Sequence, residues 1–402
     1  MKSIYLVIYL LFSITGLQAQ TKITGIVKDA ATKLPVSGAS VYVPQTTNGV
    51  SSDQNGLFTI WLKDNDAIIV SFMGYESVMA PVALLTKDES LNVIYLKTEV
   101  SELNEVIVRK RKKMNRKNWQ QYYDMFQTEF LGNSKIARQA KILNPEVLYF
   151  SISDDSLKIV ANADAPLQIY NEKLGYQIRY ELVRFECPRG HVPGVYGTTS
   201  TAVIHFGYPY FTDIVNEKKL NPKVVERNRL DAYRGSFMHF IRACYYNTLS
   251  SEGFTVRKMF LKSNPKYPGA DSIPYYMKLY RETRDLKYLR AVKEPFITVI
   301  EPNSSRRESF ITEESNRKSI AFDDYLNITY TREKEEDNYI GARNRNPTFQ
   351  TSQLKLAEGA LEIYHNGQIA DPEAIIIFGY MGWKKAGDML PFDYGLDMEV
   401  TK

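Results

Sequence analysis

Short apolar segments separated by turn residues constrain the first hundred residues more than any other feature of this chain. From Thr21 onward, apolar side chains recur in short strand-like runs, and clusters of Gly, Pro, Asn and Asp separate the runs. Asp53 and Gly56 bracket one of these turn clusters. The pattern predicts an N-terminal β-sandwich of the seven-stranded type. The expected strands are residues 23–27, 40–43, 57–62, 67–72 and 91–96.

The same region resembles a known domain family. The resemblance rests on three stretches, which are I-T-G-I-V-K-D-A-A-T-K-L-P-V-S-G-A-S-V-Y-V-P from Ile23, S-S-D-Q-N-G-L-F-T-I from Ser51 and I-I-V-S-F-M-G-Y-E-S from Ile68. They are similar to the carboxypeptidase-regulatory-like domain. The resemblance implies a transthyretin-like β-sandwich, which accompanies metallocarboxypeptidases and also precedes many outer-membrane receptors. It therefore implies a fold rather than an activity.

The N-terminus predicts export. Lys2 precedes an apolar run over residues 4–14, and the small residues that follow suit cleavage after Ala19. The run is shorter than the roughly 20 residues that a membrane-spanning helix needs, and no later segment of that kind follows. We expect a signal peptide over residues 1–19, no transmembrane segment after its removal, and a location in the periplasm or at the surface of a Gram-negative-type envelope.

A basic run divides the mature chain. Residues 109–117 carry seven positive charges, more than the net charge of +5, so the globular parts are nearly neutral. We interpret the run as a solvated linker and predict no nucleic-acid partner. The segment 101–108 resembles the stretch before the plug of TonB-dependent receptors, and a last strand or linker is the alternative that we favour. The predicted division is signal peptide 1–19, sandwich 20–98, basic linker 99–118 and C-terminal α+β domain 119–402.

The C-terminal region mixes helix and strand patterns. Aromatic residues at helical spacing from Trp119 to Phe130 predict a helix that docks on a core. A second helix is expected over 236–249, with Ser236 as its N-cap. Because strands and helices do not alternate regularly, we predict a mixed antiparallel sheet domain with a few helices, in a chain that is mainly β. The expected strands are residues 147–152, 157–160, 167–170, 176–185, 201–211, 296–300, 325–331, 361–364 and 375–378.

Cysteine and histidine positions restrict the chemistry. Cys187 and Cys244 form either one disulfide or two separately buried thiols, and the second is the default. The four histidines fit neither a His-x-x-Glu pair nor H-E-x-x-H, so we predict no metal and no cofactor. Common local signatures of hydrolases, nucleotide-binding proteins and dithiol enzymes are also missing. Catalytic groups dispersed along the chain remain open.

Two sets of side chains are candidate binding residues. On the helix 236–249, His239, Arg242 and Tyr246 lie roughly opposite the apolar face, where they form either a polar surface for a partner or an ordinary solvated face. The C-terminal tail combines aromatic and acidic residues that either pack internally or bind a sugar or peptide. This second set comprises Tyr380, Trp383, Asp388, Asp393 and Tyr394.

These observations predict a non-catalytic exported binding or scaffolding protein of the cell envelope, whose partner is an envelope protein, a polysaccharide or a peptide. One alternative is a hydrolase of envelope or dietary polymers with dispersed carboxylates at Asp323, Asp324, Asp388 and Asp393. Another is an accessory protein to a TonB-dependent outer-membrane transport system. Two carboxylates facing one cleft at about 5 to 10 Å favour the hydrolase, whereas an aromatic platform or an open sheet edge favours the binding protein.

Overall fold

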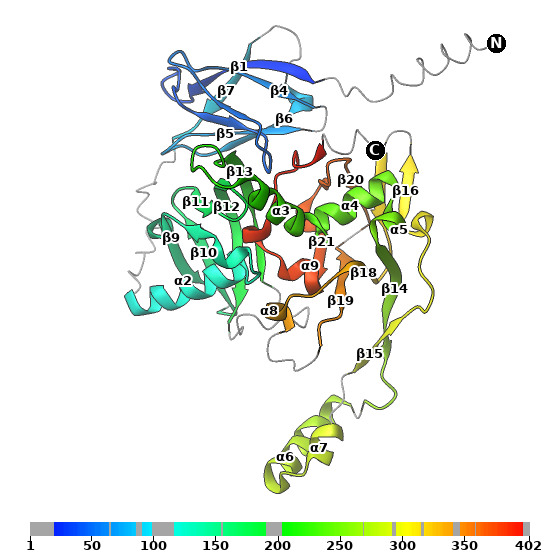
Figure 1. Ribbon diagram of the computed structural model, residues 1–402. Coiled ribbons are helices and arrows are strands. Elements are labelled where there is room, and N and C mark those ends of the chain that lie inside the picture. The colour runs from blue at the N-terminus through cyan, green and yellow to red at the C-terminus, as the bar shows by residue number, and fades with distance from the viewer. Residues whose placement is uncertain are drawn as a thin grey trace, which may run out of the picture.

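The chain folds around three hydrophobic cores, one in the N-terminal sandwich and two in the C-terminal region (Figure 1). The computed structural model describes residues 20–63, 66–85, 91–98, 116–153, 156–189, 203–267, 269–291, 295–314, 317–340, 346–357 and 359–396. The predicted signal peptide and all but the last three residues of the predicted basic linker lie outside these ranges. Within them, no helix has the length and apolar character needed to cross a membrane.

The N-terminal core lies between two sheets, which confirms the predicted seven-stranded sandwich. One sheet has the order β4-β1-β7 and the other the order β3-β2-β5-β6. Side chains alternate as the sequence predicts, so that Ile23, Val27, Phe58 and Ile60 are buried between the sheets. The strands are β1 (Thr21–Asp29), β2 (Ser40–Tyr42), β3 (Gly49–Ser51), β4 (Leu57–Leu62), β5 (Ala67–Ser71), β6 (Val78–Pro81) and β7 (Asn92–Leu96), of which β3 and β6 were not predicted.

The second core lies between a six-stranded sheet and the predicted aromatic helix. The sheet has the order β8-β11-β12-β10-β9, with β13 along the other edge of β12. Phe126 and Phe130 of α2 (Arg116–Leu131) are fully buried, and the Trp119 indole donates a hydrogen bond to the Leu148 carbonyl at 3.0 Å. The docking of this helix on a core is therefore confirmed. The strands are β8 (Lys141–Ile142), β9 (Leu148–Ile152), β10 (Lys158–Ala163), β11 (Leu167–Asn171), β12 (Tyr176–Pro188) and β13 (Ile204–Asp213).

The third core is built by a five-stranded sheet of order β15-β14-β18-β19-β21, a small sheet of order β16-β17-β20, and a central helix. All strand pairs described in the C-terminal region are antiparallel, as predicted. The elements are α4 (Phe237–Tyr246), α5 (Leu249–Glu252), β14 (Phe254–Ser263), β15 (Phe296–Ile300), β16 (Ile311–Glu314), β17 (Arg317–Ala321), β18 (Tyr325–Lys334), β19 (Phe349–Leu356), β20 (Ala360–Ile363) and β21 (Ile375–Phe378).

The helix predicted over 236–249 ends earlier than expected. Ser236 is its N-cap, and its side chain accepts a hydrogen bond from the His239 backbone. Asn247 adopts a left-handed conformation with φ of 58°, which ends α4 and starts the separate short helix α5. Asn tolerates this conformation better than most residues, so the boundary has a local cause.

The tail after β21 connects the three cores. Its helix α9 (Gly379–Trp383) places Met381 in the third core, and Leu390 packs in the second core. Further along, the Phe392 backbone N–H donates to the Gln45 carbonyl of the sandwich at 2.7 Å. One short segment therefore contacts all three folded parts.

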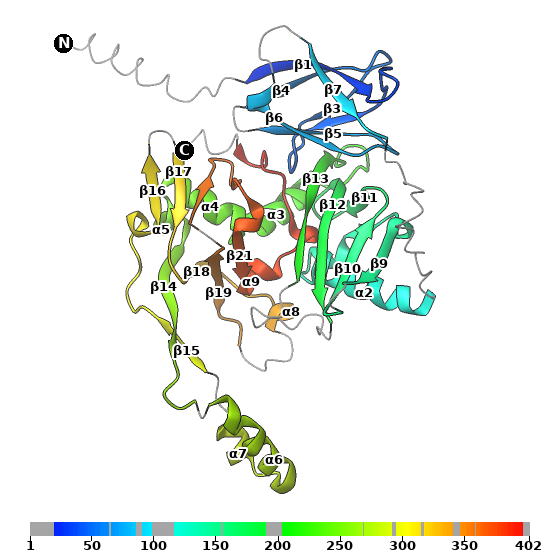
Figure 2. The same cartoon turned by 180° about the vertical axis from the view of Figure 1, so that it is seen from behind.

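The sandwich is held directly against the second core. Thr46 forms a parallel bridge with Tyr210, and its carbonyl accepts a hydrogen bond from the Phe211 backbone at 3.0 Å. The Arg179 guanidinium donates to the Ser71 hydroxyl at 2.6 Å. Figure 2 shows β13 directly beneath the sandwich. These contacts cover part of the outer edge of β13, which would otherwise offer unpaired backbone groups.

Candidate functional site

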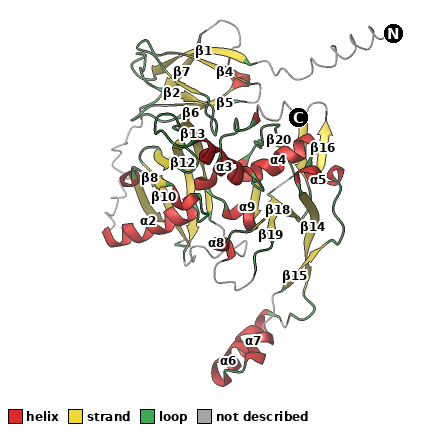
Figure 3. Ribbon diagram, viewed as in Figure 1, coloured by secondary structure: helices red, strands yellow, loops and turns green. Residues whose placement is uncertain are grey.

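A protruding arm is the most conspicuous surface feature of the C-terminal region. The first half of β14 pairs with β18, while its second half, from Met259 to Ser263, pairs with β15. Beyond the body the sheet therefore continues as a two-stranded ribbon, which leads to the helices α6 (Ile273–Thr283) and α7 (Leu286–Ala291). Figure 1 shows this arm leaving the body on the side opposite the sandwich, and Figure 3 shows its two helices apart from all others.

The ribbon exposes apolar side chains on both faces. Phe296, Ile300 and Leu261 belong to one face and are 52%, 42% and 47% exposed, while Ile297 on the other face is 43% exposed. Two-stranded ribbons are marginally stable alone in water. Contiguous exposed apolar surface on a folded protein is characteristic of an interaction site. The arm is therefore a candidate interaction surface.

The backbone of β15 is also open along its outer edge. The Glu301 N–H donates to the Lys258 carbonyl, and the Asn264 N–H donates to the Pro295 carbonyl, at the two ends of the ribbon. Hydrogen bonding alternates along an antiparallel pair. Because Pro295 and Glu301 are hydrogen-bonded on the β14 side, the backbone groups of Phe296, Thr298 and Ile300 point away from β14. In the described parts of the chain, β15 pairs with β14 alone.

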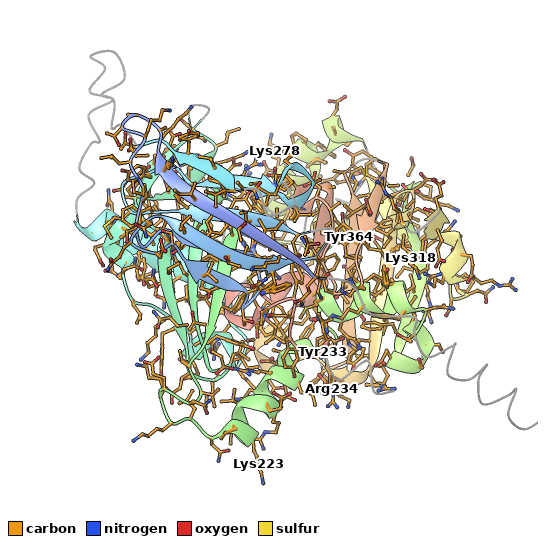
Figure 4. All side chains as sticks on the ribbon, turned by 90° about the horizontal axis from the view of Figure 1, so that it is seen from above. Lys223, Tyr233, Arg234, Lys278, Lys318 and Tyr364 are labelled. Carbon is orange, nitrogen blue, oxygen red and sulfur yellow. The ribbon has the colours of Figure 1, made fainter. Side chains whose placement is uncertain are left out.

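The tip of the arm is polar and aromatic. Arg281, Arg284 and Asp285 are exposed there, and Lys278 is labelled in Figure 4. To place the ribbon in the hydrocarbon core of a bilayer, these charges would have to enter or cross it first, which is costly. The arm is therefore better suited to bind a polypeptide than to insert into lipid.

The prediction that α4 has an exposed polar face is wrong for two of its three residues. His239 and Arg242 are only 3% and 2% exposed, while Tyr246 is 46% exposed. Burial on both sides of the helix is the cause, because Met238 packs in the second core and Phe240 in the third. A helix between two cores has no solvated face in the part that they cover.

His239 is positioned as a neutral, structural side chain. The Gly235 N–H donates to Nδ1 at 3.1 Å, so the ring proton resides on Nε2, which lies 3.3 Å from a Glu252 carboxylate oxygen. Burial, although opposed by Glu252, lowers the pKa of His239 to about 4. The ring also packs against Tyr233, at a centroid distance of 4.7 Å, at the end of α3 (Pro222–Tyr233) labelled in Figure 4.

Arg242 fastens the C-terminal tail to α4. Its Nε donates to the Asn366 carbonyl at 3.0 Å, and its Nη2 donates to the Phe392 carbonyl at 3.1 Å. The guanidinium also lies over the Tyr233 ring. These contacts hold two of the three guanidinium nitrogens of Arg242 inside the protein, so the side chain links two distant segments.

The aromatic and acidic residues of the tail pack in the interior. Tyr380, Trp383 and Asp388 are 2%, 1% and 6% exposed. The Ser134 hydroxyl donates to Asp388 Oδ1 at 2.5 Å, and Lys384 Nζ lies 3.5 Å from the same oxygen. These contacts connect the tail to the second core, and they leave no aromatic platform for a sugar or peptide at this place.

The carboxylates proposed for a hydrolase occupy three different settings. Asp323 and Asp324 are exposed in the turn between β17 and β18, and Asp388 is buried beside Ser134. Asp393 accepts hydrogen bonds from the backbone and hydroxyl of Thr47 in the sandwich. No group of three or more His, Cys, Asp and Glu residues suited to a metal ion occurs among the described residues.

The two cysteines are free and buried in separate cores. Cys187 of β12 packs in the second core, and Cys244 of α4 packs in the third. Burial raises the pKa of both thiols, that of Cys187 to about 12, so neither is a reactive thiolate at neutral pH. The possible disulfide between them does not form in this structure.

The buried neutral state of His239 makes stability depend on pH. Its folded-state pKa of about 4 lies below the unfolded value of about 6.5, so the unfolded chain binds the additional proton between these values. Stability should fall as pH drops from about 6.5 towards 4, with a loss of about 2 kcal/mol from this group by pH 5. In denaturant unfolding between pH 5 and 8, His239→Phe should show a smaller loss. Equal losses in both proteins would contradict a neutral His239.

Sequence reasoning missed most of the arm. The strand at 296–300 was predicted, but its exposure was not, and β14, α6 and α7 were not predicted. One usable signal was the alternation of Phe254 and Val256 with polar residues at the start of β14. Another was the uncharged run from Phe296 to Ile300 between two prolines, which marks a strand that ends abruptly on both sides.

Comparison with known proteins identifies the sandwich. Residues 23–108 match the model of the CarboxypepD_reg-like domain. The sandwich belongs to this family. A stretch of 96 residues is 43% identical to TonB-dependent receptor SusC of Bacteroides thetaiotaomicron and covers 24% of this chain and 9% of the receptor. A stretch of 106 residues is 28% identical to TonB-dependent receptor P39 of Formosa agariphila and covers 26% of this chain and 10% of the receptor.

The similarity of the CarboxypepD_reg-like domain to these receptors is confined to a part of each protein. This chain spans about a tenth of the length of the two receptors. The alignment with a crystal structure of a Bacteroides fragilis protein of unknown function covers 90% of this chain and 96% of that protein's chain, at 9% identity. Its TM-score of 0.15 is too low to support an argument about the fold.

The CarboxypepD_reg-like domain presents a second exposed surface on its β4-β1-β7 sheet. Trp61 and Tyr95 are 52% and 44% exposed there, and Leu57 and Val93 lie between them on the same face. Lys33 Nζ lies 4.4 Å from the centre of the Tyr95 ring. The inner face of this sheet packs on the sandwich core, whereas the arm exposes apolar side chains on both faces of a two-stranded ribbon.

Proposed function

We propose that this chain is a non-catalytic, exported binding or scaffolding protein of the cell envelope, and that it binds another polypeptide by strand addition to β15. The observation that carries the proposal is the open outer edge of β15 in a ribbon with apolar side chains on both faces. In strand addition, main-chain hydrogen bonds supply affinity, and the alternating side chains supply specificity.

The exposed side chains of the arm contribute to the stability of such a complex. Full burial of one Phe or Ile contributes roughly 1.5 to 3 kcal/mol, and Phe296, Ile297 and Ile300 are all about half exposed. Part of this gain is offset by the lost freedom of the two partners. A partner that also pairs with the edge adds main-chain hydrogen bonds to this apolar contribution.

The fixed position of the arm suits a scaffolding role. β14 is shared by the arm and the body sheet, so the ribbon is a direct continuation of the third core. The tail and the Thr46 to Tyr210 bridge hold the sandwich to the rest of the chain. A partner on β15 is thereby held at a defined distance from the sandwich, on the opposite side of the body (Figure 1).

The envelope location is supported by the similarity of the sandwich to parts of two TonB-dependent receptors. The apolar run after Lys2 supports export. The same similarity favours an accessory role in a TonB-dependent transport system as a second candidate function. In that case the polypeptide bound at β15 belongs to the transport system.

Crosslinking of the arm tests the proposal. Lys258 and Lys262 are exposed amines on β14 beside β15. With the mature chain in solubilised envelope, an amine-reactive crosslinker should join these lysines to a partner peptide identified by mass spectrometry. Ile297→Glu places a charge on the ribbon and should reduce those crosslinks at least tenfold, corresponding to about 1.4 kcal/mol.

The matched control is Thr59→Glu, which places the same charge on an exposed strand position of the sandwich. It should leave the crosslinks at the wild-type level. Crosslinks that persist in Ile297→Glu, or that arise only outside the arm, would contradict binding at β15. Turnover of an envelope polymer that disappears in Asp323 or Asp324 variants would favour the hydrolase instead.

A further inference from the structure

The sequence of β15 points to one particular partner. We propose that the polypeptide bound at β15 is a second copy of this chain, paired antiparallel to the first about a twofold axis at Thr298. This inference rests on the proposed function, because it names the partner that strand addition at β15 recruits.

The backbone phase of β15 is compatible with such a pair. The outward-facing residues are Phe296, Thr298 and Ile300, and they are symmetric about Thr298. In an antiparallel pair centred there, Thr298 exchanges both backbone hydrogen bonds with its own copy, while Phe296 pairs with Ile300 of the second copy. All three outward-facing residues are thereby paired, and the interface is the same on both copies, as a twofold dimer requires.

The side chains are also self-complementary. On one face Phe296 lies opposite Ile300 of the second copy, and on the other face Ile297 lies opposite Val299. The strand carries no charge, so self-pairing places no like charges opposite each other. For the same reason β15 offers no ion pair to select a charged foreign strand, whereas self-pairing places apolar residues opposite apolar residues and Thr298 opposite Thr298.

Pairing converts the ribbon into a four-stranded sheet of order β14-β15-β15-β14. Three or more strands with an apolar face are the minimum for an independently stable sheet, which the isolated ribbon does not meet. The antiparallel arrangement also brings the tip of each arm towards the body of the other copy. Tyr275 and Leu286 at the tip are 61% and 53% exposed, so apolar surface is available there for contact with the other copy.

A cysteine at the twofold axis tests the pairing. Opposite residues of a hydrogen-bonded antiparallel pair have Cα atoms about 5.5 Å apart, within the range of about 4.4 to 6.8 Å for disulfides. Thr298→Cys in the mature chain should therefore give a disulfide-linked dimer under mild oxidation. The native cysteines are buried and do not compete. The matched control is Thr59→Cys, an exposed strand position in the sandwich, which should crosslink at least tenfold less.

A second variant removes the pairing without removing contacts to β14. Thr298→Pro deletes a backbone N–H that faces outward, so the ribbon keeps its internal hydrogen bonds. By light scattering after size exclusion, the wild type should be dimeric at micromolar concentration, and Thr298→Pro should be monomeric.

Three results would overturn the pairing. They are a monomeric wild type at all concentrations, a dimer that survives Thr298→Pro, and equal crosslinking of the two cysteine variants. The proposed function is tested separately from this pairing. Crosslinks from Lys258 or Lys262 to a different envelope protein would exclude the second copy as the partner but would still support binding at β15.

Discussion

Replacement of Trp383 by alanine is expected to lower the free energy of unfolding by about 3 to 5 kcal/mol, the usual cost of removing a large aromatic side chain from a core. Trp383 is 1% exposed and lies between the parts of the tail that enter the second and third cores. Its ring packs against Tyr380 and Tyr339, at centroid distances of 5.3 and 5.4 Å. The cavity left by alanine would therefore loosen the connection between the two cores.

Chemical unfolding followed by circular dichroism measures this effect without relying on tryptophan fluorescence. The matched control is Trp61→Ala, because Trp61 is 52% exposed on the sandwich, and its loss should cost less than about 1 kcal/mol. If Trp383→Ala were as stable as Trp61→Ala, the tail would not hold the cores together as its contacts indicate.

Local patterns were sufficient for the sandwich. Along β4, for example, buried Phe58 and Ile60 alternate with exposed Thr59, as the strand period requires, although Leu57 on the exposed face is also apolar. The turn residues between the strands are also local signals. The two strands that were missed, β3 and β6, are short, and they are recognised through their neighbours β2 and β5 rather than through their own residues.

Nonlocal contacts explain the errors on α4. A helical wheel places His239 and Arg242 opposite the most apolar face, which predicts exposure. In the structure these two side chains contact Glu252, Asn366 and Phe392, and Phe392 is 150 residues away from Arg242 in the sequence. Periodicity reports which side of a helix faces one core, but it carries no information about a second core on the other side.

The sequence pattern of β15 did not reveal that this strand is exposed. An uncharged run such as Phe296 to Ile300 is typical of a strand buried on both faces. The structure contains this strand but leaves it outside the cores, because β14 extends beyond its partner β18 and carries β15 with it. In the proposed account the sequence pattern is correct, since a partner buries the strand in the assembled state.

Hydrogen exchange of the β15 amides should show the largest change of all when the arm is occupied. The N–H groups of Phe296, Thr298 and Ile300 face outward in the isolated ribbon and should exchange rapidly. Once a second strand accepts them, their exchange should slow by roughly 100-fold, corresponding to a pairing free energy of about 2.7 kcal/mol. Thr298→Pro and the exposed face of the sandwich provide internal references.

The measurement that tests the central claim most directly is therefore hydrogen exchange with mass spectrometry on the mature chain, in dilute solution, at high concentration and with envelope extract. The account predicts that peptides covering β15 become protected on assembly, while peptides covering Trp61 and Tyr95 of the sandwich do not. Unchanged exchange in β15 together with new protection on the sandwich face would contradict it, and would move the binding surface from the arm to the CarboxypepD_reg-like domain.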